Sequence, residues 1–181
     1  MENNDKIQIT SNHIKGFIDI INEYGKEDMV VAEVGTYVGA TTVIAAPIVK
    51  AKKGKYIAID WFKGSEETTG DHSTTTLEEN QVLKVFEKNL KIAGCKDIVE
   101  IYNMTTLEAA ALIPDKSLDI CFIDADHRYK NVKQDILAYL PKMKPGGIIC
   151  GHDFEKEAAF LYDELTEREL ENDFIPRIAI T

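Results

Sequence analysis

Short apolar runs alternate with longer stretches of helical periodicity along most of the chain. The runs rich in β-branched residues predict strands over 29–34, 55–60, 98–102, 118–123 and 146–150, with one more at 174–180. Apolar positions at helical spacing predict helices over 11–25, about 40–52, 77–93, 106–112, 129–140 and 157–170. Strands that alternate with helices need crossover connections. The pattern therefore predicts an α/β fold, a doubly wound and mostly parallel sheet with helices on both faces.

The 181 residues contain no internal repeat, low-complexity tract or linker rich in proline and serine. We therefore expect a single domain over 1–181. Within it, 1–27 forms an N-terminal helical segment, 28–154 the core, and 155–181 a C-terminal helix and strand.

Charge and cysteine content narrow the class of protein. The formal net charge of −10, with 31 acids against 21 bases, opposes binding to a polyphosphate, so nucleic acid is not an expected partner. The first ten residues lack the pattern of a signal peptide, and no apolar stretch has the length of a membrane span, so we expect a cytoplasmic protein without a membrane partner. The three cysteines are odd in number and far apart, which favours reduced core residues.

Polar residues stand at five successive strand ends. In a doubly wound sheet, ligands gather outside the carboxyl ends of the strands. Loops are polar in any case, but this set is dense enough to mark a site. The residues at or just after these strand ends, including the glycines and apolar residues beside the polar ones, are Glu33, Gly35, Thr36, Gly39, Asp60, Trp61, Asn103, Met104, Asp124, Asp126, His127, His152 and Asp153.

The loop after the first strand, in AEVGTYVGATT, is rich in glycine but fits neither common nucleotide motif. It lacks a Gly-Lys-Ser/Thr ending, and its glycines do not form the dinucleotide fingerprint. Glu33 would repel a pyrophosphate and suits a ligand that presents a cation or hydroxyls. Gly35 would let the backbone approach that ligand, and Gly39 would let the next helix pack near the strand. The alternative is that both are ordinary turn glycines.

Asp60 ends the second strand and is followed by two aromatic residues, Trp61 and Phe62. A carboxylate in this position can accept hydrogen bonds from both ribose hydroxyls. A flat aromatic surface beside it suits an adenine ring. Together with the glycine loop, these residues predict an adenosine without a phosphate, and S-adenosylmethionine is the commonest cofactor of that kind.

Four segments resemble the class I S-adenosylmethionine-dependent methyltransferases, which have a Rossmann-like sheet. They are EVGTYVGATT, IDWFKG, CFIDADHRYKNVKQDI and LPKMKPGGIICGHDF, within roughly 28–154. Within that class the chain is most similar to small-molecule O-methyltransferases of the macrocin and cephalosporin-biosynthesis type. The resemblance implies a small hydroxylated acceptor, such as a sugar or natural product. It also implies that the cofactor is bound by Glu33, Gly35, Thr36, Tyr37, Gly39, Asp60, Trp61, Asn103, Met104 and Asp124.

Methyl transfer to a hydroxyl requires removal of its proton, and two kinds of group could assist. Asp124 and Asp153 follow neighbouring predicted strands, and metal-dependent members of the resembled group bind their cation at these strand ends. Mg²⁺ or a similar divalent cation is one hypothesis, although His152 stands where a second acidic or amide ligand is usual and imidazole suits Mg²⁺ poorly. His127 is the other candidate, as a general base or as a structural residue.

Several alternatives stay open. Asp126 is predicted to cap the helix that follows it. The polar loop near 63–76, which holds His72, could cover the site or simply connect two elements. The resembled class ends its sheet with a long hairpin, which is shortened here if 174–180 is the last strand. Other functions are a silent S-adenosylmethionine-binding protein or another nucleotide-cofactor enzyme of this fold, and a homodimer is possible.

Overall fold

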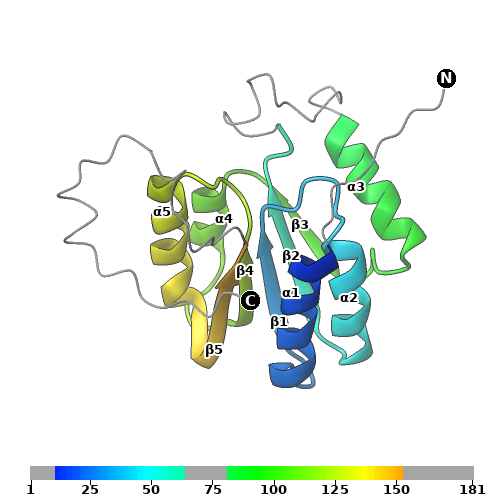
Figure 1. The fold of residues 1–181 in the computed structure, drawn as a ribbon, viewed down its shortest axis with the longest axis horizontal. Coiled ribbons are helices and arrows are strands. Elements are labelled where there is room, and N and C mark those ends of the chain that lie inside the picture. The colour runs from blue at the N-terminus through cyan, green and yellow to red at the C-terminus, as the bar shows by residue number, and fades with distance from the viewer. Residues whose placement is uncertain (1–10, 64–80, 153–181) are drawn as a thin grey trace.

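The computed structural model describes residues 11–63 and 81–152, which form a five-stranded, entirely parallel sheet (Figure 1). The order of the strands across the sheet is β3-β2-β1-β4-β5. Because the order reverses beside β1, the carboxyl ends of β1 and β4 meet at the switch point where such sheets bind ligands. The strands are β1 (Val30–Val34), β2 (Lys55–Asp60), β3 (Val99–Asn103), β4 (Leu118–Ile123) and β5 (Met143–Gly151).

Helices cover both faces of this sheet, which confirms the predicted fold class (Figure 1). Two apolar clusters divide the helices between the faces. One face packs against α1 (Ser11–Tyr24), α2 (Thr42–Ala51) and α3 (Gln81–Ile92), and the other against α4 (Thr106–Leu112) and α5 (Tyr129–Tyr139). A short 3₁₀ helix, Leu140–Lys142, leads from α5 into β5.

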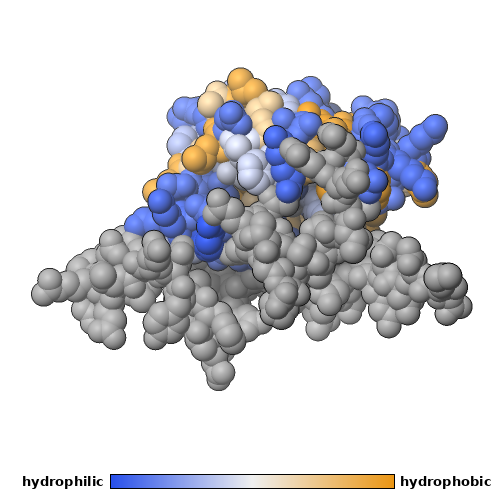
Figure 2. All heavy atoms as spheres, turned by 90° about the horizontal axis from the view of Figure 1, so that it is seen from above, coloured by the Kyte–Doolittle hydropathy of each residue, from blue (hydrophilic) through white to orange (hydrophobic). Residues whose placement is uncertain are grey.

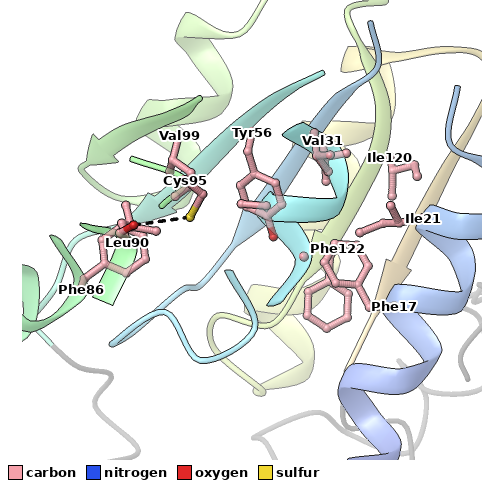
Figure 3. Close-up of a cluster of buried hydrophobic side chains, with 14 of the residues drawn as sticks. Phe17, Ile21, Val31, Tyr56, Phe86, Leu90, Cys95, Val99, Ile120 and Phe122 are labelled. Atoms are coloured by element: carbon pink, nitrogen blue, oxygen red, sulfur yellow. Dashed lines mark hydrogen bonds between the residues drawn. The ribbon is translucent and has the colours of Figure 1, made fainter. Parts of the chain in front are cut away.

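The larger cluster joins the N-terminal helix to the middle of the sheet (Figure 3). Phe17 of α1 stacks on Phe122 of β4, with ring centroids 4.4 Å apart and planes 15° apart. Ile21, one helical turn further on, is fully buried in the same cluster. The predicted amphipathic opening helix is therefore a structural part of the sheet's cover.

On the opposite face, polar groups join α4 to α5. The Thr106 hydroxyl donates to the Asp135 carboxylate at 2.5 Å, and the Tyr139 hydroxyl donates to the Thr106 carbonyl at 2.9 Å. Asp135 is almost completely buried. Burial raises the pKa of its carboxyl to about 6, although the hydrogen bond from Thr106 acts in the opposite direction.

The structure corrects the boundary of the fifth strand. The sequence predicts a turn before Gly146, but β5 begins at Met143, which pairs with Leu118. A register shift between Leu118 and Ile120 accommodates the intervening Pro and Gly residues within the strand. The predicted helix over 157–170, the strand over 174–180 and most of the loop near 63–76 lie outside the described residues.

All three cysteines are buried and reduced, as predicted. Cys95 and Cys150 belong to the larger apolar cluster and Cys121 to the smaller one. Over the described ranges, no helix combines the length and apolar character that a bilayer crossing needs.

We predict that Asp135 makes the protein less stable as the pH rises. Its pKa is higher in the folded chain than the usual 3.8, so its contribution is fully present below about pH 4 and is lost as the pH passes 6. The expected loss between pH 4 and 7 is at most about 3 kcal/mol. Urea unfolding across this range measures it, and Asp135→Asn should flatten the curve relative to wild type. Equal slopes for the two proteins would contradict the prediction.

Candidate functional site

The Asp60 carboxylate binds the backbone of the glycine loop. Its Oδ2 accepts hydrogen bonds from the backbone N–H groups of Thr36 at 2.9 Å and Tyr37 at 2.7 Å. Its Oδ1 accepts one from Phe62 N–H at 2.6 Å. A carboxylate has about four acceptor positions, so roughly one remains for an incoming donor such as a ribose hydroxyl. Asp60 therefore fixes the loop and keeps limited capacity for a ligand.

Two glycines allow this loop to lie close to its neighbours. Gly35 has a φ of 91°, and a Cβ atom on it would come within 2.2 Å of the Asp124 carbonyl oxygen. Gly39 has a φ of 83°, and its Cβ would come within 2.6 Å of the Phe86 ring. The first glycine thus permits contact with the loop after β4, and the second permits contact with α3. Both positions therefore require glycine. The predicted approach of Gly35 to a ligand stays a prediction, and Gly39 contacts α3 rather than the helix that follows the loop.

An open pocket of about 600 Å³ lies beside Asp60, at the carboxyl ends of β2 and β3. Three of its lining residues, Trp61, Asn103 and Met104, are ones that the sequence proposed for the cofactor. The Trp61 side chain is 41% exposed, which leaves part of it open to a ligand. The remaining lining residues come from the β2 loop and α4: Lys63, Thr105, Glu108, Ala111 and Leu112.

The loop also holds a polar atom that suits a ligand. Thr36 is only 5% exposed, and among the described residues its Oγ1 has no hydrogen-bond partner. A buried hydroxyl without a partner is unfavourable unless a bound molecule satisfies it. With the adjacent pocket and the close approach at Gly35, this hydroxyl fits an adenosine-containing cofactor.

Glu33 lies below the loop with its carboxylate turned into the protein. It is 1% exposed, and its Oε2 accepts hydrogen bonds from the Thr42 hydroxyl at 2.6 Å and the Tyr56 hydroxyl at 2.7 Å. Burial raises the pKa of Glu33 to about 8, although both hydrogen bonds favour the ionised form. Its predicted part in cofactor binding stays a prediction.

Asp124 lies between two imidazoles at the end of β4. Its Oδ1 is 3.4 Å from His127 Nε2 and 3.4 Å from His152 Nδ1. The His127 side chain is 48% exposed, whereas that of His152 is 21% exposed. His152 directly follows β5, and its backbone N–H donates to the Ile123 carbonyl of β4 at 3.1 Å. The structure therefore brings Asp124, His127 and His152 together.

Asp126 does not cap helix α5, which corrects that prediction. The N-cap is Arg128, without a side-chain cap bond. Asp126 instead accepts hydrogen bonds from the Arg128 backbone N–H and guanidinium and from the Asn131 amide. Burial opposes ionisation of Asp126, but these hydrogen bonds outweigh it and hold its pKa below the usual value.

The proposed metal ligands are only partly described. Asp153 lies outside the described residues, so its partnership with Asp124 stays a prediction. Within 11–63 and 81–152, no group of three His, Cys, Asp or Glu side chains could hold a metal ion. The imidazoles beside Asp124 also suit Mg²⁺ poorly. These residues alone do not fit a magnesium site.

Sequence reasoning missed the partners of Glu33 and part of the pocket wall. Thr42 and Tyr56 lie inside a helix and a strand, where a pattern of buried positions gives no sign of a hydrogen bond between elements. The pocket residues on α4 did carry a signal. Thr105 and Glu108 form a capping box, which the spacing Thr-x-x-Glu indicates.

Comparison with known proteins agrees with this geometry. A family model described as a methyltransferase domain matches residues 32–154. No curated protein matches the chain. Among solved structures, the chain is similar to a precorrin 8W decarboxylase from Methanobacterium thermoautotrophicum, with a TM-score of 0.57 and 24% identity over 84% of this chain and 68% of that one.

Two O-methyltransferases share the fold at lower identity. The S-adenosylmethionine-dependent enzyme from Thermotoga maritima has a TM-score of 0.56 and 19% identity, over 78% of this chain and 43% of that one. TomG from Streptomyces achromogenes, solved with S-adenosylmethionine, has a TM-score of 0.59 and 15% identity, over 78% and 55%.

The present chain thus spans only about half of either O-methyltransferase. The family match covers more than half of the chain, and its limits enclose the glycine loop, Asp60, the pocket and Asp124. The chain belongs to the methyltransferase domain family.

Proposed function

We propose that this protein transfers a methyl group to a hydroxyl of a small metabolite, such as a sugar or natural product. The observation that carries the proposal is the position of Asp124 and His127. They lie at the carboxyl edge of the sheet, and the Asp124 backbone is in close contact with Gly35 of the cofactor loop. An acid and an imidazole so near that loop suit deprotonation of an acceptor hydroxyl.

Each part of the site has a distinct role in this proposal. Asp60 and the pocket beside it hold the adenosine, with Trp61 against the adenine. The Thr36 hydroxyl and the loop backbone bind the rest of the cofactor. When bound, the cofactor supplies a methyl group on a sulfonium centre, which needs no further activation. The protein's remaining tasks are to orient the acceptor and to remove its proton.

His127 is the group that removes this proton. Its imidazole is about half exposed, so an acceptor can reach it, and Asp124 stabilises the imidazolium that forms. The metal hypothesis for Asp124 and Asp153 assigns the same task to a cation, but the described residues support the imidazole.

The charge of the protein and the character of its surface favour a small acceptor. A net charge of −10 disfavours RNA and DNA. Figure 2, which views the molecule from above relative to Figure 1, shows apolar residues interleaved with polar ones over the coloured part of this face. Such a mixed surface suits a partly hydroxylated molecule with some apolar area.

We predict that Trp61→Ala weakens S-adenosylmethionine binding by about 10-fold, because the adenine loses a stacking partner. Isothermal titration calorimetry of the full chain measures the dissociation constant. Ile92→Ala, which removes an exposed apolar side chain at the end of α3, serves as the control and should bind like wild type. Wild-type affinity in the Trp61 variant would remove the adenine from this pocket.

We predict that His127→Ala lowers kcat by about 100-fold and leaves the dissociation constant for S-adenosylmethionine unchanged, because only proton removal is lost. The assay follows transfer of a labelled methyl group to a panel of hydroxylated sugars and phenols. Lys130→Ala, an exposed position on α5, is the matched control. Full activity of the His127 variant would exclude the imidazole as the base. Cofactor binding with no transfer to any acceptor would favour the silent binding protein.

A further inference from the structure

Glu33 is a buried acid that the mechanism above leaves without a task. It lies in β1 directly before the glycine loop, and both of its hydrogen-bond donors are also completely buried. Thr42 comes from the first turn of α2, and Tyr56 from β2, where it lies in the larger apolar cluster (Figure 3). Three elements thus converge on one carboxyl.

The electrostatic surroundings of Glu33 disfavour its charge. Burial makes the largest contribution to its raised pKa of about 8, and the negative charges of Asp124 and Asp60 raise it further. The donors Thr42 and Tyr56 act in the opposite direction. Burial and the nearby Glu33 raise the pKa of Tyr56 well above its usual value, and the thiols of Cys150 and Cys95 add to this effect. Tyr56 therefore remains a hydroxyl donor throughout the working pH range.

A cationic ligand in the loop would favour the ionised form of Glu33 over the neutral form. Three carboxyls stand at or near the ends of β1, β2 and β4, and the described loop between them offers backbone N–H groups but no basic side chain. The cofactor of this family carries an ammonium and a sulfonium. A unit positive charge about 6 Å from Glu33, at an effective dielectric constant of about 20, would lower its pKa by about two.

We propose that cofactor binding drives ionisation of Glu33, so that most of one proton is released to solvent, and that Tyr56 and Thr42 are positioning residues that hold the carboxyl for this change. The inference rests on the proposed function only in taking this loop as the cofactor site.

The proton balance is simple. The O–H bond of the neutral Glu33 carboxyl breaks, the proton passes to the buffer, and the carboxylate stays paired electrostatically with the cationic cofactor. The hydroxyls of Tyr56 and Thr42 already donate to Oε2, so the ionised form needs no rearrangement. Before the cofactor binds, a neutral Glu33 also avoids adding a third negative charge close to Asp60 and Asp124.

Calorimetric titration of the full chain with S-adenosylmethionine at pH 7, in phosphate and in Tris, tests this directly. The two buffers differ in ionisation enthalpy, so the difference in observed heat counts the protons released. We expect most of one proton from wild type. Glu33→Gln, which mimics the neutral acid, should bind without release, and Asp97→Asn, an exposed acid paired with Lys50, should release as wild type does.

Two further measurements identify which positive charge of the cofactor acts on Glu33 and test whether Tyr56 is a positioning residue. S-adenosylhomocysteine keeps the ammonium but lacks the sulfonium charge, so proton release with it assigns the effect to the ammonium, and release only with S-adenosylmethionine assigns it to the sulfonium. Tyr56→Phe removes one donor to the carboxylate, so it raises the pKa of Glu33 and should move the pH at which proton release is greatest upward from its wild-type value. Tyr24→Phe, an exposed tyrosine, is its control.

The outcomes separate this inference from the proposed function. Binding by wild type without proton release overturns the role of Glu33 and leaves the methyltransferase site intact. Release that persists in Glu33→Gln assigns the proton to another group, such as the imidazoles beside Asp124, and also overturns it. Failure of wild type to bind either compound would instead refute the cofactor site.

Discussion

The site depends on the close approach of Gly35 to the backbone that follows β4. A side chain at this position would overlap the Asp124 carbonyl oxygen and the Ala125 Cα atom, so only glycine lets the two loops meet. Asp60 then holds the same loop from the other side through the Thr36 and Tyr37 amides. These two constraints fix the loop between β2 and β4, and every other feature of the site is arranged around it.

Such close packing brings three acids together, and the structure compensates each one differently. Asp60 accepts three backbone N–H groups, which satisfy a carboxylate without a counter-charge. Asp124 lies beside two imidazoles, which can carry a positive charge. Among the described residues, Glu33 has only hydroxyl donors, and its raised pKa keeps it largely neutral at pH 7. The different partners explain how three acids share one edge of a sheet.

The sequence predicts the sheet and the positions of the site residues, because both follow from local patterns. Asp60, Asn103 and Asp124 end strands whose apolar runs are clear, and a parallel sheet brings such ends to one edge. It does not predict which way a side chain turns once there. Glu33 points into the core because Tyr56 and Thr42 meet it from other elements, and Asp126 binds Arg128 instead of capping α5. Such contacts depend on tertiary packing, which periodicity does not encode.

The strand order also explains why the glycine loop after β1 must stay close to the ends of the strands. The pocket belongs to the ends of β2 and β3, whereas Asp124 and His127 follow β4, with β1 between the two parts. From β3 to β4 are three strand spacings, about 14 Å, which is comparable with an extended adenosine that carries an amino acid tail. A cofactor that reaches from the pocket to Asp124 must therefore cross above β1. Any side chain at Gly35 would disturb the loop at this crossing, so the glycine that packs the two loops together would also keep open the cofactor path of the proposed function.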